Sequence, residues 1–385
     1  MKRLAVQPRE NWQAAVEEQG LIWHSDADGA YWDESACYSF TLAEIEAIEA
    51  AAEEVQSLYR QAGDKIAGDE RLLSLCGIPS AYHDAVRQAW QRQDPMLDYG
   101  RFDFGYNGSG PPKLFEFNCD TPTSMLETAI VQWDWKEDRF PQRDQLNSLH
   151  EKLVARWRTI LPRLPGGRAW FTHVDDEAHE DTITTTYMRE IAMEAGCETQ
   201  GVLIDQIGID AQGRILDQDD YLITALFKLY PWEWMAVEDF GEKILPRITD
   251  TLWIEPVWKM MWSNKAVLAV LWDMFPGHPN LLPATFDAHK AGKDYVSKPV
   301  LAREGANVEV VADGRVVARS QGNYSRARLV YQERYPLRDF GPVGGKAYPV
   351  LGAWIVGGEA AGLGIREDGL ITANRSRFIP HIIED

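Results

Sequence analysis

Residues 101–124 restrict the fold of this chain more than any other stretch, because they read as two strands around a tight connection. Polar and apolar residues alternate in residues 101–104 and again in residues 113–118, which is typical of strands with one buried face. Residues 107–112 between them are Asn, Gly, Ser, Gly, Pro and Pro, a composition typical of turns. The segment therefore predicts a hairpin.

Three oxygen-bearing side chains fall at matching positions on this hairpin. Glu116 and Asn118 are two apart on the second strand and share a face, and Asp103 on the first strand can lie opposite them. Two carboxylates and an amide carbonyl are hard oxygen donors, which suit Mg²⁺ rather than Zn²⁺. The hairpin therefore indicates a magnesium site with positions left for the phosphates of a nucleotide. Solvent-facing polar positions of an ordinary hairpin are the alternative.

Hydroxyl and basic side chains flank the acidic strand. Thr121, Thr123 and Ser124 follow it, just before a helical segment at residues 124–131, and Arg101 opens the hairpin. A hydroxyl-rich turn ahead of a helix supplies a cap and main-chain donors for an anion. This context favours a site for a charged ligand over a simple surface hairpin.

The charge balance and the cysteine usage narrow the class of protein. The 385 residues are 45% hydrophobic and 25% charged with a net charge of −20, which is typical of a folded, acidic protein of two or three lobes. This charge disfavours broad binding to nucleic acid or to an anionic membrane, although a local basic cleft remains compatible with it. The four cysteines form no CxxC pair, no stretch resembles a signal peptide, and the longest apolar run, residues 266–272, is too short to span a bilayer. We therefore expect a cytoplasmic protein with reduced thiols and without a nucleic-acid or membrane partner.

Helical and strand patterns alternate through the first two thirds of the chain. Residues 42–66 predict a long surface helix and residues 144–161 another. Residues 169–173, 182–195 and 198–203 then predict a strand, a helix and a strand, which together form a βαβ unit.

An acidic loop, residues 175–181, follows the first of these two strands. Ligands bind beyond the carboxyl ends of such strands, so Glu180 and Asp181 can hold a cationic amine there. Solvated charge and a helix cap are the alternative interpretation of this loop.

The last third of the chain changes to an antiparallel pattern with basic residues at the element ends. Lys265 lies on a predicted helix at residues 264–274, and Lys298 lies on a short apolar strand, where a lysine needs a charge partner. Arg303 lies in a loop, residues 301–308, which is neither a Walker A loop nor a dinucleotide fingerprint but can cover a phosphate. Arg366 follows a glycine-rich strand, where the backbone can approach a ligand. Surface charge and ordinary salt bridges are the alternatives for these residues.

Four separated runs point to a family: FEFNCDTPTS, SNKAVLAVLWDMFPGHPNLLP, SKPVLAREGAN and WIVGGEAAGLGIRED. They resemble, in the same order, the synthetase domain of the glutathionylspermidine synthase family, including its stand-alone acid–amine ligases. The resemblance implies an α+β / α/β structure with an ATP-grasp-like fold, circularly permuted as in eukaryotic glutathione synthetase, and with a βαβ substrate lobe. It implies one synthetase unit over residues 1–385, with sub-lobes at 1–165 (helices and metal hairpin), 166–260 (substrate) and 261–385 (ATP), and no amidase domain.

The resemblance also assigns roles to individual residues. It implies that Mg²⁺ binds Asp103, Glu116 and Asn118, and that ATP contacts Lys265, Lys298 and the hinge-strand residues Gln332 and Glu333. Arg101 matches an arginine beside the transferred phosphoryl group, and Arg303 and Arg366 match arginines that reach the acyl phosphate. The predicted substrate residues are Glu180, Asp181, Thr123 and Ser124, and residues 302–307 are expected to form part of a closing loop.

The function that the resemblance implies is an ATP-dependent carboxylate–amine ligase. It joins the two substrates through an acyl phosphate and releases ADP and phosphate, with glutathione or a peptide as the candidate acid and a polyamine or another amino compound as the candidate amine. A small-molecule kinase with the same nucleotide site and a non-catalytic ATP-binding regulatory protein are the alternatives. The sequence does not indicate the oligomeric state.

Three positions depart from the family pattern at the substrate end. Ala178 and Arg377 stand where the bifunctional members carry acidic residues, and Ser124 replaces a cysteine. Two missing carboxylates weaken the attraction for a multiply charged polyamine. The residues therefore leave the identity of the acid and the amine open.

Overall fold

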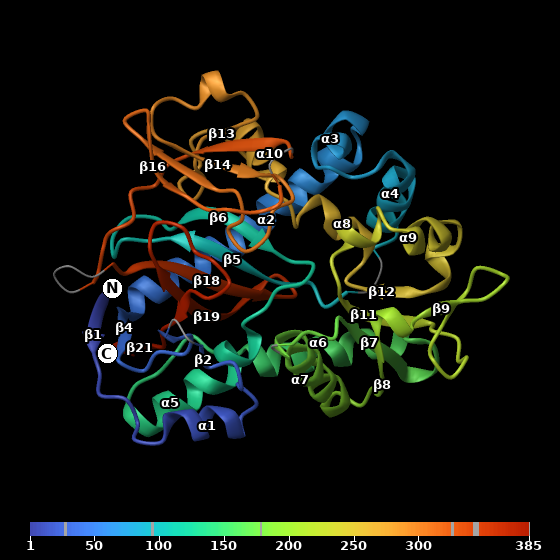
Figure 1. Ribbon diagram of the computed structural model, residues 1–385, viewed down its shortest axis with the longest axis horizontal. Coiled ribbons are helices and arrows are strands. Elements are labelled where there is room, and N and C mark those ends of the chain that lie inside the picture. Colours follow the sequence, from blue (N-terminus) through green and yellow to red (C-terminus); the bar gives the residue numbers. More distant parts are fainter. Residues whose placement is uncertain (27–28, 94–95, 178, 325–326, 342–345, 385) are drawn as a thin grey trace.

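The computed structural model describes residues 1–26, 29–93, 96–177, 179–324, 327–341 and 346–384. Sheets and helices are mixed along the whole chain (Figure 1). The α-helices are α1 (Trp12–Glu18), α2 (Leu42–Ala67), α3 (Glu70–Leu75), α4 (His83–Arg92), α5 (Gln132–Arg139), α6 (Leu149–Ile160), α7 (Glu180–Glu194), α8 (Trp232–Met235), α9 (Asp239–Ile244) and α10 (Ala266–Met274). Short 3₁₀ or π turns lie at Ser80–Tyr82, Glu127–Val131, Leu161–Arg163, Pro165–Gly167, Ile204–Gln206, Leu245–Asp250, Val257–Met261 and Ala288–Lys290.

A central antiparallel sheet carries the predicted hairpin. Its strand order is β20 (Arg377–Phe378), β19 (Glu359–Asp368), β18 (Tyr348–Val356), β5 (Tyr99–Gly105) and β6 (Lys113–Asn118). Because side chains alternate along a strand, Phe102 and Phe117 face α2, where both rings contact Tyr59. Asp103 and Glu116, which are register partners, belong to the opposite face. The predicted hairpin is confirmed, and its polar face is free to line a site.

A parallel sheet contains the strand–helix–strand unit predicted from residues 169–203. Its order is β12 (Leu252–Ile254), β11 (Ala225–Leu229), β7 (Arg168–His173) and β8 (Glu198–Leu203), with α7 between β7 and β8. Figure 1 shows α6 and α7 beside this sheet, and a small ribbon, β9 (Gly208–Ile209) with β10 (Ile215–Leu216), extends from it. The predicted βαβ unit is confirmed.

A second antiparallel sheet lies above the central one in Figure 1. Its order is β13 (Ala284–Thr285), β17 (Leu329–Glu333), β14 (Tyr295–Pro299), β15 (Glu309–Ala312) and β16 (Arg315–Arg319), and α10 packs against β13 and β17. A small sheet of β1 (Lys2–Ala5), β4 (Ala36–Thr41) and β21 (His381–Glu384) brings the two ends of the chain together, and β2 (Ser25–Asp26) pairs with β3 (Gly29–Ala30).

Two helix predictions need correction. The segment 144–161 becomes helical only at Leu149, because Asp144 and Asn147 form isolated bridges with Ile383 and Gly362 instead. The predicted surface helix is α2, which buries one face against β18 and β19 of the central sheet. Its high content of Ala and Glu is typical of an exposed helix and gave no indication of this buried face.

The predicted sub-lobes interleave in space. Strands β5 and β6 from residues 1–165 share a sheet with β18 to β20 from residues 261–385. The division into three sub-lobes stays a prediction. Within the described residues, no helix is both long and apolar enough to cross a membrane.

Candidate active site

The polar face of the β5–β6 hairpin brings the three predicted metal ligands together. Asp103 pairs in register with Glu116, and Asn118 Nδ2 donates to Asp103 Oδ2 over 3.2 Å. All three side chains line a cleft between the sheets. The described residues contain no cluster of three His, Cys, Asp or Glu side chains suited to a metal. A cation here would therefore rely on two carboxylates, the amide and oxygens from a bound ligand, which fits Mg²⁺ and its liking for phosphate oxygens.

Cations neutralise both carboxylates of the hairpin. Arg101 Nε lies 2.7 Å from Asp103 Oδ1, and Lys265 Nζ lies 3.0 Å from Glu116 Oε2. Burial alone would raise the pKa of Glu116, but Lys265, Lys298 and Arg101 outweigh it and lower that pKa to about 2. Glu116 is therefore ionised at any working pH, as a metal ligand must be.

The neighbouring strand leaves room for Arg101. Gly352 on β18 is the register partner of Asp103, and a Cβ there would lie 2.7 Å from Arg101 Cδ. Arg101 crosses this gap, and its Nη1 donates to the carbonyl oxygen of Thr123 over 2.7 Å. The guanidinium is thus fixed between Asp103 of the β5–β6 hairpin and the loop that follows the hairpin.

One end of the cleft is an apolar chamber with a polar edge. Lys298 Nζ on β14 donates to Gln332 Oε1 on β17 over 2.8 Å and to the carbonyl oxygen of Phe115 over 3.0 Å. Burial lowers the pKa of Lys298 to about 8, against the opposing effect of Glu116. Glu333 lines the same chamber, whose apolar walls are Val296, Val308, Val310, Leu337, Leu370 and Ile371. A flat ring with hydrogen-bonding edges fits such a chamber.

The other end of the cleft is a polar chamber at the carboxyl edge of the parallel sheet. Glu180 and Asp181 form the first turn of α7, where the side chain of Asp176 accepts from both of their main-chain N–H groups. Burial, with help from Glu127, raises the pKa of Glu180 to about 7, and burial with Asp176 raises that of Asp181 to about 6. Both acids therefore exchange protons near neutral pH.

Arg303 and Arg366 also line the polar chamber. Arg303 Nη1 lies 3.0 Å from Glu233 Oε1, and its Nη2 donates to the hydroxyl of Thr121. Arg366 donates instead to main-chain carbonyls, those of Asn374 at 2.8 Å and Ser376 at 3.2 Å among them. The charge of Arg366 is thus held by neutral acceptors and is available to an anion.

The two chambers adjoin each other and share part of their walls. Asp103, Glu116 and Lys265 line both of them, together with Gly305, Val350 and Thr372. The β5–β6 hairpin therefore lies at the junction between the apolar chamber and the polar chamber.

Comparison with known proteins identifies the family. The model of the family "Glutathionylspermidine synthase preATP-grasp" matches residues 3–384. The chain belongs to this family. A Haemophilus influenzae protein named "Putative acid--amine ligase" is 38% identical over 92% of both chains.

Longer family members match in part. The bifunctional glutathionylspermidine synthetase/amidase of Escherichia coli is 27% identical over 90% of this chain, which spans 59% of that protein. The trypanothione synthetase of Crithidia fasciculata is 29% identical over 84% of this chain, which spans 53% of that protein. A glutathione synthetase-like effector from Globodera pallida has the same fold, with a TM-score of 0.59 at 11% identity over 97% of this chain and 95% of its own. The predicted glutathione-synthetase-like fold is confirmed, and the circular permutation stays a prediction.

The structure brings all but one of the predicted site residues together in the cleft. Every one of them lines the cleft except Ser124, which is buried, adopts a left-handed φ of 71° and has its Oγ 3.4 Å from the hydroxyl of Tyr31. Arg377 does not line the cleft and binds Glu367 and Asp33 instead. Ala178 lies outside the described residues.

The sequence analysis missed part of the cleft wall. Trp234 lines the polar chamber, and residues 370–374 line both chambers between them. Residues 370–374 carry no charge and no turn motif, so nothing in the sequence pointed to them. The exposure of Trp234 is unusual for a tryptophan, but only the structure shows it.

Proposed function

We propose that this protein is an ATP- and Mg²⁺-dependent ligase that joins a carboxylate to an amine through an acyl phosphate and releases ADP and phosphate. The observation that carries the proposal is the position of Asp103, Glu116 and Lys265 at the junction of the two chambers. A phosphoryl group held there lies between a nucleotide and a second substrate. Membership of a family of ligases supports the same chemistry.

The first half of the reaction needs charge neutralisation and alignment more than covalent help. Asp103, Glu116 and Asn118 would hold Mg²⁺, which neutralises phosphate charge when bound. Lys298 and Gln332 orient the nucleotide in the apolar chamber, with Glu333 at its edge. Lys265, Arg101, Arg303 and Arg366 surround the site of transfer with positive charge, so that the carboxylate of the acid substrate can approach the γ-phosphate. Thr123 lies on the same wall and supplies a hydroxyl for the bound acid.

The second half of the reaction needs a neutral amine beside the acyl phosphate. Glu180 and Asp181 attract an ammonium group when ionised, and their raised pKa values let them take its proton near neutral pH. The amine then attacks the acyl carbon, and phosphate leaves. Water must be excluded during this step, which we assign to closure of residues 302–307.

The substrates belong to the classes that the relatives' names indicate. We propose a small peptide such as glutathione as the acid and an amino compound as the amine, both of them small molecules. With Arg377 turned to Glu367, the described part of the polar chamber offers Glu180, Asp181 and Glu304 as its acidic groups near the substrate arginines. This set suits one ammonium group better than an extended polycation.

The test is ADP release by the purified protein with ATP and Mg²⁺ across a matrix of acids and amines, with products identified by mass spectrometry. ADP release that requires both substrates and yields an amide supports the ligase. A phosphorylated product formed without amine shows a kinase, and tight ATP binding without turnover on any pair shows a binding protein.

Glu116→Gln tests the site assignment in the same assay. It should reduce ADP release by about a hundredfold or more, because the junction loses a ligand charge. Glu309→Gln, which removes a carboxylate from the exposed ion pair with Arg319, is the matched control and should change the rate by less than about twofold. Full activity of Glu116→Gln would exclude a metal role for this residue.

A further inference from the structure

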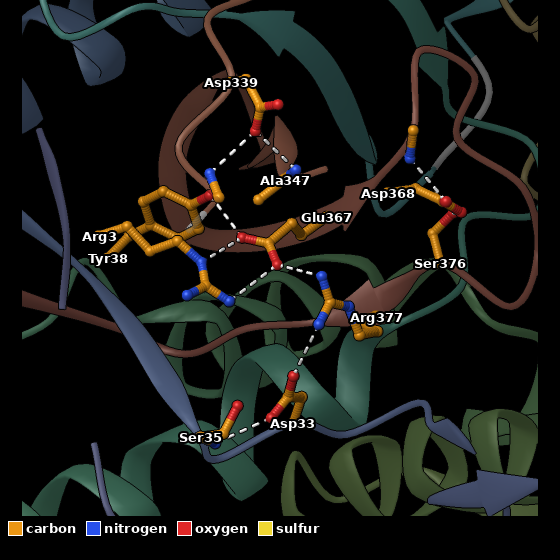
Figure 2. Close-up of polar contacts among 12 residues, drawn as sticks. Arg3, Asp33, Ser35, Tyr38, Asp339, Ala347, Glu367, Asp368, Ser376 and Arg377 are labelled. Atoms are coloured by element: carbon orange, nitrogen blue, oxygen red, sulfur yellow. Dashed lines mark hydrogen bonds and ion pairs between the residues drawn. The ribbon is translucent and has the colours of Figure 1, made fainter. Parts of the chain in front are cut away.

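A buried polar network behind the cleft is centred on Glu367 (Figure 2). Its carboxylate is fully buried and accepts from Arg3 Nε at 2.7 Å, from the Tyr38 hydroxyl at 2.6 Å and from Arg377 Nη2 at 2.5 Å. Arg377 also contacts Asp33 Oδ2 at 3.2 Å. One carboxylate therefore receives donors from β1, β4 and β20.

Glu367 is the next residue after Arg366 on β19. Successive side chains of a strand point to opposite faces, so Arg366 lines the cleft while Glu367 is held by the network. Arg377, its register partner, directly follows residues 369–376, which connect β19 to β20. The pair Glu367–Arg377 thus closes the base of that connecting loop.

The connecting loop, residues 369–376, is braced from inside as well. The hydroxyl of Ser376 donates to Asp368 Oδ2 at 2.5 Å, and Ser376 Oγ accepts from the main-chain N–H of Ala373 at 2.8 Å. Figure 2 shows the contact between Asp368 and Ser376 beside the Glu367 network.

The connecting loop forms a wall shared by both chambers. Residues 370–372 line the apolar chamber and residues 372–374 line the polar one. It also meets the other loop over the junction, because a Cβ on Gly305 would lie 2.3 Å from the carbonyl oxygen of Thr372. The guanidinium of Arg366 donates to three carbonyls of this same loop, those of Ala373, Asn374 and Ser376.

Burying charged groups carries a desolvation cost, so well-packed apolar residues would stabilise the fold at least as much as this ionic network does. What ionic contacts add is fixed geometry at both ends of the loop on which Arg366 rests. We propose that Glu367 is a positioning residue: by binding Arg377 it fixes the loop 369–376, and through the carbonyls of that loop it orients the guanidinium of Arg366 toward the reacting phosphate. The proposal rests on the proposed function, because it takes Arg366 as the group that stabilises the transferred phosphoryl.

The first test needs no substrate. Arg377→Gln cuts the contact between Glu367 and β20, while Arg3 and Tyr38 still serve the buried carboxylate, so the fold is kept. Asp33→Asn is the matched control, because it removes the other carboxylate partner of Arg377 and leaves the Glu367 contact in place. Hydrogen exchange of the amides in residues 369–376 should accelerate by about tenfold or more in Arg377→Gln and stay unchanged in Asp33→Asn. Equal exchange in wild type and Arg377→Gln would overturn the proposal.

The second test reads the effect on Arg366. We expect Arg377→Gln to lower kcat for ADP release by about tenfold to a hundredfold with a smaller change in KM for ATP, as a small misplacement of a transition-state group does. Combined with Arg366→Lys, it should cause no further loss, because it acts through that residue. An unchanged kcat, or losses that multiply in the double variant, would contradict the positioning role. Wild-type protein that releases no ADP on any substrate pair would count against the proposed function instead, and the exchange result decides the loop's anchoring in either case.

Discussion

At the scale of single residues, the junction of the two chambers contains two ion pairs. Asp103 and Glu116 are paired with Arg101 and Lys265 without any ligand. In the proposed reaction, a nucleotide phosphate would pair with the two cations and its divalent metal ion with the two carboxylates, so each side chain would exchange one charged partner for another. This limits the desolvation cost of binding, because none of the four groups is left without an opposite charge.

Gly352 offers a direct test of how Arg101 is positioned. A methyl group at this position would lie 2.7 Å from Arg101 Cδ and 3.1 Å from the carbonyl oxygen of Gly364, so the guanidinium must move. Gly352→Ala should lower kcat by about tenfold to a hundredfold, since small misplacements at a reacting centre are costly. Gly208→Ala is the control, because the space around Gly208 is open. Equal kinetics for the two variants would show that Arg101 has no fixed role.

Glu180 should lower the stability of the fold at high pH. Burial raises its pKa in the folded protein to about 7, whereas the unfolded chain ionises near the ordinary value, so the folded state holds more protons between these limits. The resulting penalty is absent below the ordinary pKa, grows as the pH rises and is complete above about 7. Glu180→Gln should therefore raise the Tm at pH 8 by roughly 1–5 °C and leave it nearly unchanged at pH 4.

Thermal unfolding at both pH values measures this effect. Glu10→Gln, which changes an exposed carboxylate, should shift the Tm at neither pH. A Glu180→Gln variant that is less stable than wild type at pH 8 would show that this carboxylate has a stabilising partner.

At the scale of elements, α7 places the acidic pair. The helix begins at Glu180, two residues earlier than the pattern predicted, because Asp176 accepts from the N–H groups of Glu180 and Asp181. The first helical turn after the carboxyl end of β7 therefore presents its first two side chains to the cleft. Ligands generally bind at this edge of a parallel sheet, and here the edge presents two carboxylates.

Removing this cap should affect function more than stability. Asp176→Ala should cost about 1 kcal/mol of unfolding free energy and raise the KM for the amine severalfold, because the turn that carries Glu180 and Asp181 frays. Asp69→Ala removes a carboxylate that likewise accepts from two main-chain N–H groups, at the start of α3, and that lines neither chamber, so it should cost similar stability without changing the KM. Denaturant unfolding and steady-state kinetics measure the two effects, and equal KM values for both variants would contradict this role.

At the scale of the whole molecule, the site depends on contacts between sheets. Asp120, in the loop after β6, pairs with Lys228 of β11 over 2.6 Å, and both side chains are fully buried. The other oxygen of Asp120 accepts from the main-chain N–H of Trp232 at 2.8 Å. One carboxylate thus joins the loop after the β5–β6 hairpin to the parallel sheet, beside which α7 carries the acidic pair.

Breaking this contact should destabilise the molecule strongly. Lys228→Met leaves Asp120 buried without its cation and should cost about 3–5 kcal/mol, and Asp120→Asn in addition should recover part of the loss. Lys65→Met removes the exposed pair with Asp273 and should cost less than about 1 kcal/mol. Chemical unfolding measures all three values. A small effect of Lys228→Met would mean that water or another group replaces the lysine.

The sequence by itself determined the local parts of this protein. Strand alternation predicted the β5–β6 hairpin with Asp103 opposite Glu116 and Asn118, and β8 has the predicted bounds, because side-chain period and turn composition act over a few residues. The same local signals failed at residues 144–148, where bridges to Ile383 and Gly362 override helical spacing. The quoted motifs, which lie far apart in the sequence, already indicated the family.

Only the tertiary structure decided how those parts meet. In the folded protein Ser124 is buried outside the cleft lining, Arg377 pairs with Glu367, and the uncharged residues 370–374 form a wall shared by both chambers. Each outcome depends on partners that are distant in sequence, such as Arg3 with Glu367 or Asp120 with Lys228. Local propensity carries no information about such contacts, because burial and charge pairing arise only when the sheets assemble.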